Sequence, residues 1–300
     1  MSLADITQKI ERNLSTILHE GATVEVGFFG GSFTCLDIDK QKQYLEIVQP
    51  YIHNQQIDSI RLSTRPDYID EAELLFLKEF HVKTIELGVQ SMNDDVLKQS
   101  GRGHTALDVL HASKLIKSHD FQLGLQMMVG LPGDDADTCM HTAQMILSLM
   151  PDCVRIYPTL VIQNTELEDL YLEGKYKAMT LEEGVDRVAP ILKLFLDNSI
   201  NVIRVGLHPS EEFDKGGKLL AGPYHPSFRE LVMTKLWYDE FCNIPISEHK
   251  DISITVPTSD YNVAIGFNAR NRNYLKQQFR RVRFLKSDSL TNFSYHVDYC

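Results

Sequence analysis

The stretch Val24-Glu-Val-Gly-Phe-Phe-Gly-Gly-Ser-Phe33 decides the fold, because an apolar run stops there at two glycines and a helical pattern follows. Residues 61–69, 85–91 and 125–132 have the same form, each ending at Gly, Pro or a small polar residue. Repeated strand–helix units with such strand ends are typical of a parallel barrel that holds a ligand at the carboxyl ends of its strands. We therefore expect an α/β fold built as a barrel.

Strands and helices alternate with a period of roughly 30–40 residues. The pattern predicts a helix at 4–19 and then strands at 24–29, 59–63, 84–89, 122–129, 154–157 and 201–205. A doubly wound open sheet would alternate in the same way. No G-x-G-x-x-G follows the first strand, however, which argues against a dinucleotide-binding fold.

After Gly206 the alternation ends. A strand at 251–256, a helix at 268–279 and a strand at 282–285 follow a loop rich in Gly and Pro. We therefore predict two domains, a partial barrel at 1–235 and a small α/β appendage at 236–300.

The composition is that of an ordinary globular enzyme, with 43% hydrophobic and 24% charged residues in a chain of 300. No apolar stretch approaches the ~18 residues of a membrane span, and the first residues do not resemble a secretory signal. The cysteines are scattered without metal-ligand spacing: Cys35, Cys139, Cys153, Cys242 and Cys300. We expect reduced thiols, no metal ligands in this chain, no membrane contact and a cytoplasmic location.

The net charge of −11 is unevenly distributed. The segment 270–286 carries +7 and no acidic residue, so the remainder carries −18. Its cations are Arg270, Arg272, Lys276, Arg280, Arg281, Arg283 and Lys286. Such a strip indicates either an anionic partner or an ordinary solvated surface.

Three groups of residues at the strand ends have chemistry suited to a ligand. Gly30, Gly31 and Ser32 leave the backbone open to close approach, although Gly-Gly also serves ordinary turns. The amide of Gln90 can both donate and accept hydrogen bonds. Arg102, between two glycines, is suited to pair with a carboxylate. Beside it, His104 could be a ligand group, a helix cap or a surface residue.

Gly30-Gly31-Ser32, Gly88-Val-Gln-Ser91, Gly101-Arg-Gly-His104 and Met128-Val-Gly-Leu-Pro132 resemble the oxygen-independent coproporphyrinogen oxidase branch of the radical S-adenosylmethionine (SAM) superfamily. The chain is more similar to the Elongator catalytic-subunit branch, through Ser63-Thr-Arg-Pro-Asp-Tyr68, Val154-Arg-Ile-Tyr-Pro-Thr-Leu-Val161 and Ala221-Gly-Pro-Tyr-His-Pro226. The resemblance extends over about 4–235 and rests on several motifs in a fixed order.

This resemblance implies a partial six-strand (β/α) barrel, without its first strand, that binds SAM across the strand ends. Gly30, Gly31 and Ser32 would meet the amino group of the SAM methionine, and Arg102 its carboxylate. Gln90 and Ser63 would face the ribose or sulfonium, and Gly130 and Leu131 would flank the adenine. Ser63 stands where several relatives have Glu, and Gln126 where the coproporphyrinogen branch has Asp.

Relatives hold a [4Fe–4S] cluster on a C-x3-C-x2-C loop, which delivers the electron that cleaves SAM to a 5′-deoxyadenosyl radical. This motif is absent from the chain. Either the chain is a piece of a longer enzyme, which alone would be inactive, or it is a degenerate barrel that binds without catalysis. No catalytic residue is identified.

The resemblance implies a radical SAM enzyme that acts on tRNA or a related nucleic acid. The alternatives are a coproporphyrinogen-oxidase-like enzyme for a small molecule, or a non-catalytic binding protein. The basic segment 270–286 is the expected tRNA contact. Residues 264–275 loosely resemble the turn of a KH-type RNA module, although the GXXG pattern is missing.

Overall fold

The computed structural model describes residues 3–17, 21–208, 217–246, 251–291 and 293–299. The chain divides into two compact units. The first comprises Met1–Met127 with Gln144–Arg155, and the second comprises Met128–Ala143 with Ile156–Cys300. The predicted domain boundary at residue 235 lies inside the helix α10 (Phe228–Phe241), and it stays a prediction.

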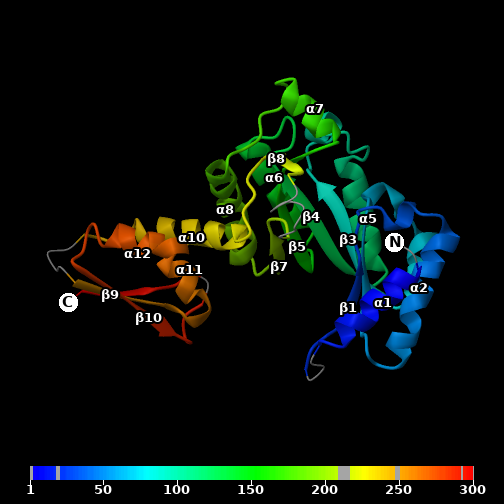
Figure 1. Cartoon of the computed structure of the whole chain (residues 1–300), viewed down its shortest axis with the longest axis horizontal. Coiled ribbons are helices and arrows are strands. Elements are labelled where there is room, and N and C mark those ends of the chain that lie inside the picture. The colour runs from blue at the N-terminus through cyan, green and yellow to red at the C-terminus, as the bar shows by residue number, and fades with distance from the viewer. Residues whose placement is uncertain (1–2, 18–20, 209–216, 247–250, 292, 300) are drawn as a thin grey trace. The chain divides into compact units, whose positions relative to one another are not determined.

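The principal sheet has six strands in the order β1-β2-β3-β4-β5-β7, and Figure 1 shows strands of this sheet with helices beside them. The strands are β1 (Glu25–Phe28), β2 (Ser59–Thr64), β3 (Val82–Gln90), β4 (Gln122–Val129), β5 (Cys153–Pro158) and β7 (Val202–Val205). β1, β2, β3 and β4 pair in parallel. A doubly wound sheet reverses its strand order at a switch point, whereas here neighbours follow the chain without reversal. The predicted partial barrel is confirmed.

Eight helices of the described residues precede or follow these strands, and several of them begin at a side-chain cap. They are α1 (Leu3–Leu14), α2 (Ile38–His53), α3 (Glu71–Glu79), α4 (Asp94–Gln99), α5 (Ala106–Ser118), α6 (Ala136–Ser148), α7 (Glu166–Leu172) and α8 (Leu181–Asp197). Asp70 caps α3, and Thr105 and Thr180 form capping boxes with Asp108 and Glu183. Each cap satisfies backbone N–H groups of the first turn that have no partner within the helix.

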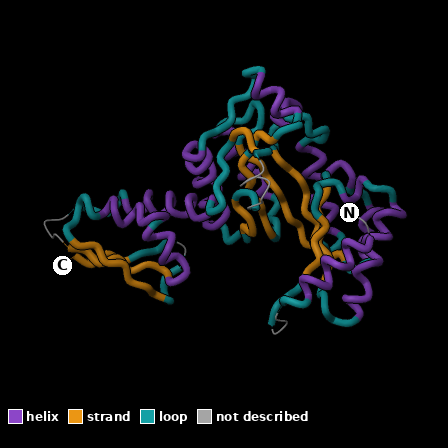
Figure 2. Tube along the Cα trace, viewed as in Figure 1, coloured by secondary structure: helices purple, strands orange, loops and turns teal. Residues whose placement is uncertain are grey.

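A second sheet lies near the carboxyl end, in the second unit. Its order is β10-β9-β11, formed by β9 (Asp251–Pro257), β10 (Arg281–Ser287) and β11 (His296–Tyr299). β9 pairs in parallel with β10 and antiparallel with β11. Figures 1 and 2 show α10, α11 (Tyr261–Ile265) and α12 (Arg270–Leu275) on one side of these strands. The predicted small α/β appendage therefore forms a layer of helices on a sheet.

Four details differ from the sequence expectations. The first helix ends at Leu14 rather than 19, and residues 18–20 lie outside the described residues. The helix predicted at 268–279 is shorter, Arg270–Leu275, and it begins late because Asn268 and Ala269 adopt left-handed φ of 50° and 59°. β11 was not predicted, nor was the pair β6 (Val161–Ile162) and β8 (Leu219–Ala221).

Within the described residues, no helix combines the length and the apolar composition that crossing a bilayer requires.

Candidate ligand site at the strand ends

The glycine pair closes β1 with an open backbone. Gly30 and Gly31 have φ of 152° and 73°, values that favour glycine. A Cβ built at either position would meet no atom within 4 Å, so both residues border open space. Ser32 follows and is exposed. These three residues lie together at the carboxyl end of β1, where a ligand can approach the main chain.

A groove of about 660 Å³ runs along the same strand. Ile6 and Ile10 of α1 line it together with Phe28, Gly30 and Ser32. α1 places its apolar stripe on this groove because Ile6 and Ile10 recur at helical spacing. The glycine pair thus adjoins a mainly apolar cavity of a size suited to a small ligand.

A cluster of polar side chains is buried in the first unit, with the carboxylate of Glu86 at its centre. Glu86 of β3 is 0% exposed. It accepts a hydrogen bond from Arg61 Nη1 at 2.8 Å, two from Arg155 at 2.6 and 3.0 Å, and one from Gln126 Nε2 at 2.9 Å. Gln126 Nε2 also lies 3.3 Å from Ser63 Oγ. The two predicted residues Ser63 and Gln126 are therefore in contact, and both belong to this cluster.

The charges of the cluster compensate one another. Burial alone would raise the pKa of the Glu86 carboxyl, but hydrogen bonds from Arg155, Arg61 and Gln126 outweigh it, and this pKa is lowered. Arg61 also pairs with Glu25 of β1 at 2.9 Å, and its pKa is raised despite burial. Two carboxylates and two guanidinium groups thus form a network that is neutral overall, which is the condition under which buried charges are tolerated.

Strand register explains why these residues meet. Ser63 is paired with Glu86, Glu86 with Gly124, and Gly88 with Gln126, so their side chains stand on the same face of neighbouring strands. Gly124 leaves room for the carboxylate, since a Cβ there would come within 2.5 Å of Glu86 Cγ. The absence of a side chain at position 124 is therefore a requirement of the cluster.

Gln90 and Arg102 lie beyond the end of β3. Gln90 has a left-handed φ of 63°, and its Nε2 would be 2.8 Å from a Cβ at Gly88. Arg102 is half-buried, and burial lowers the pKa of its guanidinium. The side chain of Arg65 reaches this turn as well, because a Cβ at Gly103 would lie 3.1 Å from Arg65 Nη2. The sequence pattern did not single out Arg65.

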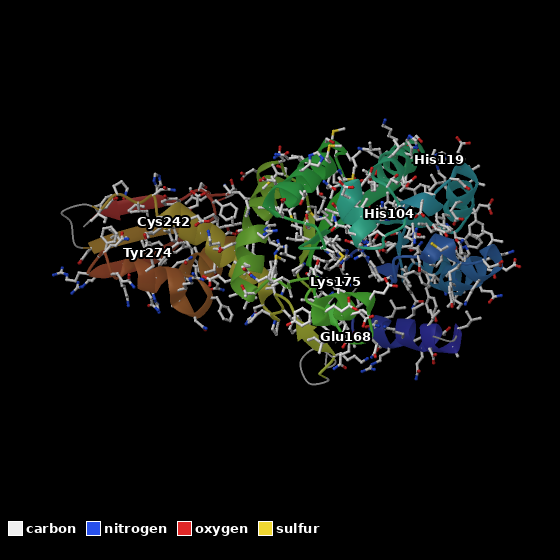
Figure 3. The ribbon with its side chains drawn as sticks, turned by 90° about the horizontal axis from the view of Figure 1, so that it is seen from above. His104, His119, Glu168, Lys175, Cys242 and Tyr274 are labelled. Atoms are coloured by element: carbon white, nitrogen blue, oxygen red, sulfur yellow. The ribbon has the colours of Figure 1, made fainter. Side chains whose placement is uncertain are left out.

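His104 has a structural role. Its ring is buried, and Nε2 lies 3.1 Å from the carbonyl oxygen of Val89 in β3. The cap of α5 is Thr105, so His104 is neither a cap nor a surface residue. Figure 3 labels His104 within the ribbon of this region. This hydrogen bond fixes the turn that carries Arg102 to the end of β3.

Gly130 and Leu131, expected near the adenine, belong to the second unit. The N–H of Gly130 donates to Asp134 Oδ2 at 2.9 Å, and its carbonyl accepts from the hydroxyl of Tyr176 at 2.7 Å. The side chain of Met179 occupies the space that a Cβ at position 130 would need. Burial and the charge of Asp134 raise the pKa of Tyr176 to about 12. Both backbone groups of Gly130 thus have partners within the chain.

The basic residues do not form one surface. On β10, Arg281 and Arg283 are exposed and alternate with Phe284, whose ring packs 5.8 Å from that of Phe241 in the helix layer. Arg281 and Arg283 therefore face away from the helices. Arg270 of α12 lies in the helix layer itself, with its guanidinium 5.8 Å from the ring centre of Tyr238.

Lys286 of β10 reaches the helix layer, with its Nζ 4.7 Å from the ring centre of Tyr261 in α11. Arg272 and Lys276 belong to α12 and its C-cap. Arg280 pairs with Asp251 at 3.0 Å, at the start of the sheet. Cations that are continuous in the sequence therefore lie in two layers of the structure, the helix layer and the sheet.

The residues described in the structure do not fit an iron–sulfur cluster. No group of three or more His, Cys, Asp or Glu side chains within them could hold a metal ion. Cys139 and Cys153 are buried, and burial raises the pKa of both thiols, that of Cys139 to about 12. A cluster needs several thiolates gathered at one place, and neither thiol belongs to such a group within the described residues.

The sequence does contain a signal for the buried cluster, although the strand-end motifs do not include it. Arg61, Glu86 and Arg155 are charged residues that each lie between two buried or half-buried apolar neighbours in a strand. A charge in a strand that is buried on both faces needs a partner of opposite sign on a neighbouring strand. The sequence therefore signals that these charges need partners, but the partners themselves follow only from the strand register.

Two family models match the chain. The model of the radical SAM superfamily matches residues 4–146, and that of the Radical_SAM C-terminal domain matches residues 151–238. The chain is 27% identical to a tRNA uridine(34) acetyltransferase of Methanocaldococcus infernus over 196 residues, which is 59% of this chain and 37% of the relative. It is 33% identical to human Elongator complex protein 3 over 138 residues, 45% of this chain and 25% of the relative.

A solved structure shares the fold. The archaeal Methanocaldococcus infernus Elp3 with an N-terminal deletion aligns with a TM-score of 0.68 and 24% identity, covering 78% of this chain and 58% of that one. This chain therefore spans well under half the length of the two curated relatives.

Proposed function

Because the chain belongs to the radical SAM superfamily, we propose that it forms part of a radical SAM enzyme that modifies tRNA. The curated relatives that carry tRNA and Elongator names support this substrate over a small molecule of the coproporphyrinogen type. A tRNA substrate also implies a cytoplasmic enzyme. The division into a barrel at 1–235 and an appendage at 236–300 remains part of the proposal.

The observation that carries the proposal is the open backbone of Gly30 and Gly31 beside a cavity. A cradle without side chains suits the methionine end of SAM, whose amino and carboxylate groups need close polar partners. The proposed SAM contacts are Gly30, Gly31, Ser32, Ser63, Gln90, Arg102, Gln126, Gly130 and Leu131. When bound, SAM supplies the radical chemistry for which the superfamily is named.

The residues of this chain act by binding and orienting. Arg102 would pair with the ligand carboxylate, and Glu86 holds the amide of Gln126 in a fixed direction. Ser63 Oγ, which is buried, accepts a hydrogen bond from Gln126 Nε2, and this contact helps to fix the direction of the amide. Because the described residues do not fit an iron–sulfur cluster, we derive no step through one.

Calorimetric titration with SAM tests the site. Arg102→Ala is expected to weaken SAM binding about tenfold or more, since a hydrogen bond to a charged group contributes about 1.5–3 kcal/mol. Arg12→Ala, an exposed arginine on α1, is the matched control and should bind as the wild type does. Equal affinities for both variants would remove Arg102 from the site, and a wild type without affinity for SAM would overturn the cofactor assignment.

Binding of unmodified tRNA at increasing salt tests the substrate. We expect affinity to fall steeply with salt, because phosphate contacts release counterions. Arg281→Glu should reduce the salt slope, whereas Lys83→Glu, the same charge change at an exposed position of β3, should leave it unchanged. A chain that ignores tRNA at low salt would end the nucleic-acid proposal and favour a small-molecule substrate.

A further inference from the structure

Phe29 is a large aromatic residue left exposed where β1 meets the glycine pair. It is 56% exposed and follows the edge strand β1, none of whose residues is buried, so its ring is accessible to a ligand. Part of its ring lies over Gly27, where a Cβ would overlap the ring carbons. The absence of a side chain at Gly27 therefore leaves room for one part of the Phe29 ring, and much of the remaining ring surface is open to a ligand.

Arg155 of β5 holds this ring in place. Its guanidinium carbon lies 4.9 Å from the ring centre of Phe29, within the range of a cation–π contact. Two hydrogen bonds to the fully buried Glu86, at 2.6 and 3.0 Å, fix the guanidinium in turn. The ring is thus ordered before any ligand arrives, so a ligand that packs on it loses little entropy in doing so.

We propose that Phe29 is a stacking platform for a nucleobase of the substrate. This inference rests on the proposed tRNA function and adds the residue that contacts a base. Single-stranded RNA is recognised by unstacked bases placed on aromatic side chains. The ring already has a guanidinium cation against it, so a second cation such as a sulfonium is disfavoured there, and a neutral planar base is preferred. Phe29 also lines the groove beside Gly30, so the adenine of SAM is the competing base, and a SAM titration of the variant separates the two.

The probe is a stem-loop RNA with 2-aminopurine in its single-stranded loop, whose fluorescence falls when the base stacks. Phe29→Ala should weaken binding about 5- to 150-fold, the equivalent of about 1–3 kcal/mol for one stacked base, and should abolish the quenching. The loss should be the same at every salt concentration, because stacking releases no counterions. Phe29→Trp should retain both affinity and quenching.

Leu75→Ala is the matched control, since Leu75 is 58% exposed on α3 and has no part in the site. If Phe29→Ala binds and quenches as Leu75→Ala does, the platform is wrong while the tRNA function stands. If the wild type does not bind the RNA, both proposals fall. A SAM titration separates a third outcome: Phe29→Ala should keep its SAM affinity, and a loss there would assign Phe29 to the cofactor instead.

Discussion

Replacing Glu86 with glutamine would test whether the buried cluster supports the first unit. The change keeps the shape of the side chain and removes its charge, so Arg61 and Arg155 lose their shared counter-charge. Removing one partner of a buried ion pair typically costs about 3–5 kcal/mol of unfolding free energy. Arg61 retains Glu25, and the new amide can still accept one hydrogen bond, so we expect a loss of about 3 kcal/mol, at the lower end.

Urea denaturation followed by far-UV circular dichroism measures this loss as a shift of the midpoint at constant slope. Fluorescence of Trp237, the single tryptophan, reports on the second unit in the same samples. The control is Glu46→Gln, which removes an exposed pair with Lys42 at 3.8 Å and should change stability by less than about 1 kcal/mol. If Glu86→Gln is no less stable than this control, the cluster does not stabilise the fold and our reasoning fails.

The difference in stability between the wild type and Glu86→Gln has an expected pH dependence. The pKa of Glu86 is lowered in the folded state, so its contribution is complete above the ordinary pKa of glutamate, about 4.3. This contribution to the free energy of unfolding is lost as the pH falls through the lowered pKa that Glu86 has in the folded state. The stability difference between the wild type and Glu86→Gln should therefore be largest near neutrality and shrink in acid. A difference that grows on acidification would contradict the assignment.

Two further predictions concern space and reactivity. Gly124→Ala should lower the free energy of unfolding by about 1–3 kcal/mol in urea denaturation, because the new methyl group would displace the Glu86 side chain. An unchanged midpoint would show instead that the strand shifts to make room for the methyl group. At about pH 8 a disulfide reagent should react quickly with the exposed Cys242 and not with the buried Cys139, because a pKa of about 12 keeps the Cys139 thiol protonated. Rapid modification of Cys139 in the native protein would show that the structure around this residue opens.

The strand ends were predictable from sequence because each one carries its own local signal. Gly30, Gly31 and Gly130 have positive φ, so the glycines that predicted the ends of β1 and β4 are required there by backbone conformation. The caps Asp70 and Thr105 are local as well. Signals of this kind need only a few neighbouring residues, and they were sufficient to locate the strand ends along the chain.

Long-range features were not predictable in the same way. The partners of Glu86 lie on β2, β4 and β5, and only the strand register brings them together. The start of α12 was placed two residues too early because Asn268 and Ala269 take the left-handed conformation without being glycine. The division of the basic segment follows partly from strand alternation on β10, which puts Arg281 and Arg283 on one face, and partly from the change from helix α12 to strand β10.

One helix of the second unit serves two hydrophobic cores. α10 packs against α8 of the strand–helix repeat, and its Phe241 ring also packs on Phe284 of β10, while its Trp237 ring packs on Phe293 just before β11. Unfolding of the β10-β9-β11 sheet would therefore expose aromatic side chains of α10, although this helix would still pack against α8. Folding of these parts is thermodynamically coupled, and a protein engineer who wishes to separate them would have to leave α10 whole and supply a substitute for whichever neighbour is removed.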